Sequence, residues 1–123
     1  MTSLPHVESM DGLTAWDACR RLATWPHVAF FDSAQRTALG RYSYVTADPP
    51  LWLTSQRGWI SENGRFVGIA DPLHVLARQL AEFRIEPIND APPFQGGAAG
   101  LFSYDLCHHI EVLPRAEFDD FRI

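Results

Sequence analysis

Two short polar clusters flank one loop and have the chemistry to bind a small zwitterion. Asp32 and Ser33 lie on one side of the loop, and Arg41, Tyr42 and Ser43 lie on the other. A carboxylate pairs with an ammonium, and a guanidinium pairs with a carboxylate through two parallel bonds. Asp32 and Arg41 therefore suit the two ends of an amino acid. The alternative, which is the commoner arrangement, is a capped strand end beside a surface arginine.

A glycine-rich stretch at residues 92–106, PPFQGGAAGLFSYDL, raises the question of a phosphate loop. A P-loop needs G-x-x-x-x-G-K-[ST], and this chain contains no lysine. The dinucleotide pattern G-x-G-x-x-G fails as well, because the spacing here is G-G-x-x-G. We therefore interpret Gly96, Gly97 and Gly100 as part of a strand that passes close to another backbone or forms a bulge.

The remaining reactive side chains do not form a recognisable catalytic or metal-binding pattern. Cys107, His108 and His109 are consecutive, and neighbours on a helix point about 100° apart, which disfavours a shared metal ion. Tyr104 and Asp105 suit the start of a short helix, where the helix dipole favours an acid. No serine lies in a G-x-S-x-G setting. We expect no catalytic residue and no metal site on this chain.

Composition narrows the class of protein. The 123 residues are 46% hydrophobic and 20% charged, with a net charge of −5, as in globular proteins. An acidic chain is a poor partner for nucleic acid, whose binding depends on neutralising phosphates. Two cysteines and no signal-peptide pattern suggest reduced thiols and a cytoplasmic location. No apolar run approaches the roughly 20 residues of a membrane span.

Two helices and several short strands must position these residues. The apolar spacing predicts a helix within residues 10–27, with Asp11 or Thr14 as its cap, and a second helix over residues 71–83, capped by Asp71. In the second helix we predict one apolar stripe, formed by Leu73, Leu76, Ala77, Leu80 and Phe83.

The strands are predicted from short apolar or alternating runs. They fall at residues 28–31, within 41–50, at 51–56 and twice within 58–70. Asn63-Gly64 is a strong signal for a two-residue hairpin turn. A further strand within residues 94–103 is predicted to lead into a short helix over 104–113. The predicted fold class is α+β, with a mainly antiparallel sheet, two main helices and a short third one.

The end of the sequence is half apolar, with Phe118, Phe121 and Ile123 as its large side chains. Nothing after them in the chain can pair with them. We therefore expect residues 1–123 to be one part of a longer protein.

Three stretches together resemble a known enzyme family. They are FFDSAQRTALGRYSYVTADP, ADPLHVLARQLAEF and PPFQGGAAGLFSYDLCHHIEVLP. In order and spacing they are similar to the N-terminal region of component I of aminodeoxychorismate synthase and of anthranilate synthase, which use chorismate. The resemblance covers about residues 28–123, and its DSA…GRYSY form is closer to the aminodeoxychorismate branch.

The resemblance implies a longer enzyme whose chorismate-binding catalytic part is absent here, so this chain alone is expected to be inactive. The fold would be the N-terminal part of the two-sheet fold of that family. The enzyme would use chorismate, Mg²⁺ and ammonia from a glutamine amidotransferase subunit. The aminodeoxychorismate branch aminates C4 on the route to 4-aminobenzoate and folate, whereas the anthranilate branch aminates C2 and loses pyruvate.

The resemblance also implies a tryptophan pocket beside the strand that ends in serine. By position in the motif, Asp32 and Ser33 form one wall, and Arg41, Tyr42 and Ser43 form the second. Asp32 stands where anthranilate synthases have glutamate, which makes feedback inhibition by tryptophan doubtful. A freestanding amino-acid binding module is the alternative that the residues alone leave open.

Overall fold

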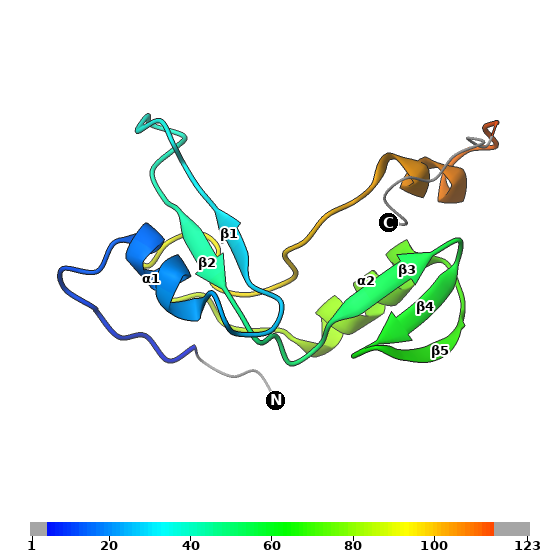
Figure 1. Cartoon of the computed structure of the whole chain (residues 1–123), viewed down its shortest axis with the longest axis horizontal. Coiled ribbons are helices and arrows are strands. Elements are labelled where there is room, and N and C mark those ends of the chain that lie inside the picture. The colour runs from blue at the N-terminus through cyan, green and yellow to red at the C-terminus, as the bar shows by residue number, and fades with distance from the viewer. Residues whose placement is uncertain (1–4, 115–123) are drawn as a thin grey trace. The chain divides into compact units, whose positions relative to one another are not determined.

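The protein is α+β, with two antiparallel sheets and three helices in residues 5–114, which the computed structural model describes (Figure 1). This architecture confirms the predicted fold class. The half-apolar segment with Phe118, Phe121 and Ile123 lies outside the described residues. The elements are α1 (Ala15–Leu22), β1 (Ala29–Phe31), β2 (Tyr44–Thr46), β3 (Leu53–Gln56), β4 (Trp59–Glu62), β5 (Arg65–Ile69), α2 (Pro72–Glu82) and the 3₁₀ helix η1 (Tyr104–His109).

The chain forms two compact units. The first contains the described residues up to Pro50 together with Phe83–Ala98. The second contains Leu51–Glu82 together with the described residues from Ala99 onward. The candidate site lies entirely in the first unit.

In the first unit, α1 begins after a capping threonine. The backbone N–H of Asp17 donates to Thr14 Oγ1 at 3.1 Å, which satisfies one of the free donors of the first turn. The helix ends at Leu22, and the next turn is closed by a bond of 2.8 Å from Trp25 N to Leu22 O. Of the two predicted caps, Thr14 is the one that the structure has. The helix ends at Leu22, before the predicted stop at Pro26, because this turn closes it.

The first unit also contains the two-stranded sheet. β1 and β2 are antiparallel, with Phe31 opposite Tyr44 at one end and Ala29 opposite Thr46 at the other. α1 packs against this sheet, and the rings of Trp16 and Phe30 lie 6.1 Å apart. This packing holds the end of β1, and with it residues 32 and 33, in place.

The second unit contains the sheet β3-β4-β5, in which both neighbouring pairs are antiparallel. Asn63 and Gly64 connect β4 to β5 with φ values of 50° and 76°, as the predicted hairpin turn requires. A second turn of this kind joins β3 to β4 through Arg57 and Gly58, with φ values of 52° and 81°. Arg-Gly is a weaker turn signal than Asn-Gly, and the sequence did not reveal it.

The second unit also contains α2, which starts where the sequence predicts. Asp71 Oδ1 accepts the backbone N–H of Leu73 at 2.8 Å, and Pro72 occupies the first helical position, where its missing N–H costs nothing. The predicted apolar stripe is buried only in part. Leu73 and Leu76 are half-buried, whereas Leu80 is 39% exposed. The buried residues of the helix are Pro72 and Val75, and Gln79 donates to Glu62 Oε1 of β4 at 3.0 Å.

The glycine-rich stretch is a loop rather than the predicted strand. Gly97, inside the predicted span of residues 94–103, has a φ of +129°, outside the range of a strand. The predicted helix over 104–113 is the shorter 3₁₀ helix η1, and Asp105 lies in its first turn as expected. Tyr104, the first residue of η1, is 87% exposed.

Among residues 5–114, no helix is both long enough and apolar enough to cross a membrane.

Candidate functional site

The candidate site begins with a hydrogen-bond network at the ends of β1 and β2. In an antiparallel pair, the residues that follow one strand lie opposite those that precede the other. Ser33 N donates to Ser43 Oγ at 3.0 Å, and Ser33 Oγ donates to Tyr42 O at 2.7 Å. Ser43 Oγ in turn donates to Asp32 Oδ1 at 2.9 Å. These side chains continue the strand pairing past Phe31 and Tyr44 and fix the Asp32 carboxylate.

An open pocket of about 500 Å³ lies beside this network. Its volume falls in the range of pockets for small molecules. The lining comes from β1, from the loop that follows it, from the start of β2 and from the segment of residues 83–98. The lining residues are Phe31, Asp32, Ser33, Leu39, Tyr42, Tyr44 and Pro93.

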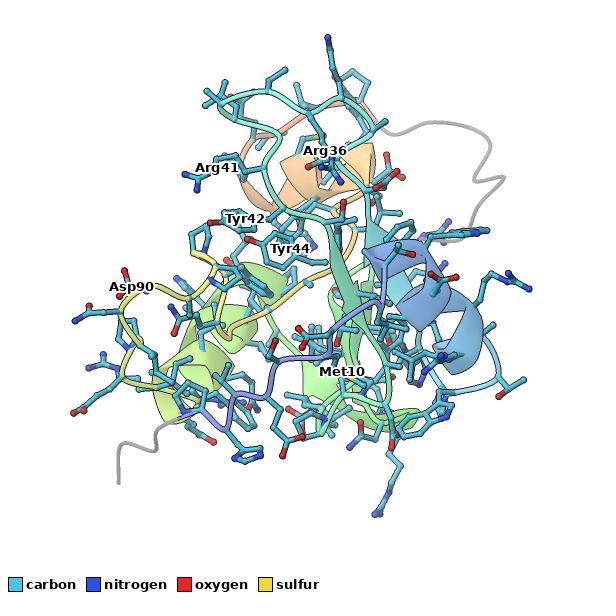
Figure 2. The ribbon with its side chains drawn as sticks, turned by 90° about the vertical axis from the view of Figure 1, so that its left-hand side faces the viewer. Met10, Arg36, Arg41, Tyr42, Tyr44 and Asp90 are labelled. Carbon is cyan, nitrogen blue, oxygen red and sulfur yellow. The ribbon has the colours of Figure 1, made fainter. Side chains whose placement is uncertain are left out.

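Aromatic rings form one wall of the pocket. The rings of Tyr42 and Tyr44 lie 6.4 Å apart, and the two side chains are neighbours in Figure 2. Tyr44 also meets Phe94 edge to face, with 5.7 Å between ring centroids. Edge-to-face contacts of this length are a favoured geometry for aromatic pairs. Phe94 therefore supports the Tyr44 ring from outside the pocket.

Each predicted site residue has a definite place in this arrangement. Asp32, Ser33 and Tyr42 line the pocket, and Ser43 holds Asp32 and Ser33 from behind. Arg41 is not a lining residue. Its guanidinium lies 5.3 Å from the centre of the Tyr42 ring, a cation–π contact, and its side chain points outward in Figure 2. The pairing of Arg41 with a ligand carboxylate stays a prediction.

The pocket suits a ligand with an ammonium group and an apolar side chain. A carboxylate accepts several hydrogen bonds at once, so the bond from Ser43 to Asp32 leaves capacity for an ammonium. Tyr42, Tyr44 and Pro93 offer ring and apolar surface that aromatic side chains contact well.

Several of the lining residues were not predicted as site residues. Phe31 and Tyr44 were assigned only to strands, and Pro93 only to the entry of the glycine-rich stretch. Leu39, which is 99% exposed at the rim, was assigned only to a polar loop. Pro93 lies 60 residues after Ser33 in the chain, so local spacing carries no signal for its place at the pocket.

The glycines serve this segment in different ways. A Cβ on Gly96 would lie 2.8 Å from Ile85 Cδ1, so residue 96 passes tightly over an isoleucine side chain rather than over the predicted backbone. Gly97 has the left-handed φ of +129° that favours glycine. Gly100 has open space where a Cβ would be. Of the three glycines, only Gly96 is therefore in close approach to another part of the chain.

Among the described residues, no three His, Cys, Asp or Glu side chains lie close enough together to hold a metal ion. Cys107, His108 and His109 follow one another in η1.

Known proteins similar to this chain carry two names. The aminodeoxychorismate synthase component 1 of Salmonella typhimurium is 41% identical over 78 residues, which are 60% of this chain and 17% of that protein. The protein of the same name from Escherichia coli is 40% identical over 84 residues, or 65% of this chain and 18% of that protein. The anthranilate synthase component 1 of Mycobacterium bovis is 31% identical over 121 residues, or 89% of this chain and 23% of that protein.

No family model and no solved structure matches the chain. The chain spans about a fifth of the length of these relatives, between 17% and 23%. The match falls on the N-terminal part of each of them. Through its matched residues, the chain is thus similar to the N-terminal part of component 1 of the aminodeoxychorismate and anthranilate synthases.

Proposed function

We propose that this chain is the N-terminal portion of component I of an aminodeoxychorismate synthase, an enzyme that aminates chorismate at C4 towards 4-aminobenzoate and folate. The observation that supports the proposal is the similarity of 41% and 40% to two proteins of that name, beside 31% to 38% for anthranilate synthase components. In the complete enzyme, a glutamine amidotransferase subunit supplies the ammonia. The number in the name "component 1" supports such a second subunit.

Within this enzyme, the pocket at the ends of β1 and β2 binds tryptophan. Asp32 accepts the ammonium, and Tyr42, Tyr44 and Pro93 face the indole. The aromatic wall and the fixed carboxylate support this assignment. Arg41 reaches the ligand carboxylate only if it leaves its place over the Tyr42 ring.

The chain alone does not catalyse amination. In the complete enzyme, chorismate and Mg²⁺ bind in the C-terminal catalytic part. An apolar surface in the second unit also supports a role as one part of a larger protein. Trp59 and Phe66, with ring centroids 5.1 Å apart, are 58% and 56% exposed, and exposed apolar patches often mark contact surfaces.

A chimeric enzyme tests the proposal. The matched N-terminal segment of the Escherichia coli component 1 is replaced by this chain, and amination of chorismate is measured with Mg²⁺ and ammonia. We expect the chimera to form 4-amino-4-deoxychorismate, and we expect the isolated chain to form none. A chimera that is folded and monodisperse but inactive, beside an active parent, would contradict the proposal.

Two other functions remain as alternatives with observations of their own. The match that covers 89% of the chain is to an anthranilate synthase component, so the same exchange is made in that protein and the activities of the two chimeras are compared. The pocket is built within one unit, which also suits a freestanding amino-acid binding module. Tight tryptophan binding by a monomer of the isolated chain would favour the module.

A further inference from the structure

The side-chain amide of Gln95 closes a loop of the first unit. Gln95 Nε2 donates to the carbonyl oxygen of Ile88 at 2.9 Å, and Ile88 N donates to Gln95 Oε1 at 2.7 Å. Both groups of the amide are thus paired with both backbone groups of one residue. Such a pair imitates a step of an antiparallel ladder. We call residues 88–95 the amide-closed loop.

The amide-closed loop carries two residues of the pocket. Pro93 belongs to the lining, and Phe94 meets the Tyr44 ring edge to face at 5.7 Å. Both residues directly precede Gln95. The position of this wall therefore depends on where Gln95 is held.

The backbone after Gln95 is also held close to the start of the loop. Gly96 passes over Ile85, where a Cβ would lie 2.8 Å from Cδ1, and Gly97 has a φ of +129°. A Cβ on Gly97 would lie 3.5 Å from the Phe94 ring. The segment thus turns just beyond the amide, and Gln95 supplies the hydrogen bonds that join its two arms.

We propose that Gln95 is a positioning residue of the tryptophan pocket, whose amide holds the 88–95 loop closed and so places Pro93 in the lining and Phe94 against Tyr44. This inference rests on the proposed tryptophan site, because the loop positions part of the wall that would contact the ligand. Gln95 does not touch the ligand. It acts through the two residues that precede it.

The test uses isotope-labelled chain of the full 123 residues and nuclear magnetic resonance. Gln95→Met keeps the length of the side chain and removes both hydrogen bonds. Gln95→Glu keeps an acceptor for Ile88 N and serves as the second variant. The matched control is Gln79→Met, which removes the amide that bonds Glu62 in the other unit. The β1–β2 amide signals report whether the first unit is folded in each variant.

Three quantities are measured in each variant. They are the exchange rate of the Ile88 amide hydrogen, the chemical shift of the ring protons of Tyr44, whose ring contacts Phe94, and the affinity for L-tryptophan up to millimolar concentrations. In Gln95→Met we expect faster exchange, a change in the Tyr44 ring shift and affinity lower by about tenfold, which is the effect of losing about 1.4 kcal/mol. Gln95→Glu shows a smaller loss, and Gln79→Met leaves all three unchanged.

A double-mutant cycle separates positioning from general stability. If Gln95 acts through Phe94, then adding Gln95→Met to Phe94→Ala lowers the affinity by much less than Gln95→Met does alone. Unchanged Tyr44 shifts and unchanged affinity, in the presence of fast Ile88 exchange, would overturn the inference. If the unaltered chain binds no tryptophan, its pocket does not hold that ligand without the rest of the enzyme. The chemical shift of the Tyr44 ring protons then decides the inference alone. A changed shift in Gln95→Met supports the positioning role of Gln95, and an unchanged shift overturns that role.

Discussion

Ser43 Oγ donates to Asp32 Oδ1 at 2.9 Å and accepts the backbone N–H of Ser33 at 3.0 Å. One hydroxyl therefore ties the residues that follow β1 to the residue that precedes β2. Removal of this hydroxyl takes a hydrogen-bond donor from the Asp32 carboxylate and an acceptor from the backbone N–H of Ser33. The hydroxyl thus contributes to the stability of the first unit as well as to the shape of the site.

The variant Ser43→Ala tests this relationship. We expect the free energy of unfolding to fall by about 1–2 kcal/mol, because two hydrogen bonds are lost, and tryptophan affinity to fall with it. Chemical denaturation measures the first effect and a tryptophan titration measures the second. Ser9→Ala is the control, since Ser9 makes one long exposed bond of 3.3 Å to Asp11. Equal effects of the two substitutions would count against the role of Ser43.

Gly97 is predicted to be intolerant of a side chain for conformational reasons. Its φ of +129° is one that L-residues rarely adopt, so Gly97→Ala should cost about 1–3 kcal/mol of stability. Gly100→Ala is the matched control, because Gly100 has no positive φ and open space at its Cβ. Thermal unfolding of the two variants gives the comparison. A Gly97→Ala variant as stable as the control would show that the turn is not strained.

The hairpin residue Asn63 makes two separable contributions. Its φ is 50°, and its Oδ1 accepts Trp52 N at 2.8 Å. Asn63→Gly keeps the φ and loses the side-chain bond, which should cost about 1 kcal/mol. Asn63→Ala loses the side-chain bond and also places an alanine at a positive φ. It should cost about 1–2 kcal/mol more than Asn63→Gly, since a Cβ disfavours the left-handed region. The two variants are compared by urea unfolding, and the reverse order of stability would refute this division.

The elements could be predicted from the sequence where local chemistry determines them. Asn63-Gly64 marked a hairpin, and Asp71-Pro72 marked the start of a helix; the structure contains both. The strand predicted within residues 94–103 failed because its alternation ignored the φ that Gly97 adopts. The apolar spacing of α2 indicated half-buried Leu73 and Leu76 but not the buried residues Pro72 and Val75, because burial depends on contacts with other elements, such as the bond from Gln79 to Glu62.

The pocket could be predicted only in part for a similar reason. Asp32, Ser33 and Tyr42 stand near one another in the sequence, so a local pattern indicated them. Pro93 and its support Phe94 come from a distant segment and reach the pocket through the amide of Gln95. A side-chain amide that bonds a backbone seven residues away has no periodicity that a sequence pattern would reveal.

We propose that the pocket between Asp32 and the tyrosine wall binds tryptophan by its ammonium and its ring. The most direct measurement is a resonance titration of the chain with L-tryptophan and, separately, with 3-indolepropionate, which lacks the ammonium. We expect tryptophan to shift the signals of Ser33, Tyr42 and Tyr44, and the analogue to bind several-fold more weakly because it gives Asp32 no partner. Equal binding of the two compounds, or shifts confined to residues outside the pocket, would contradict the claim.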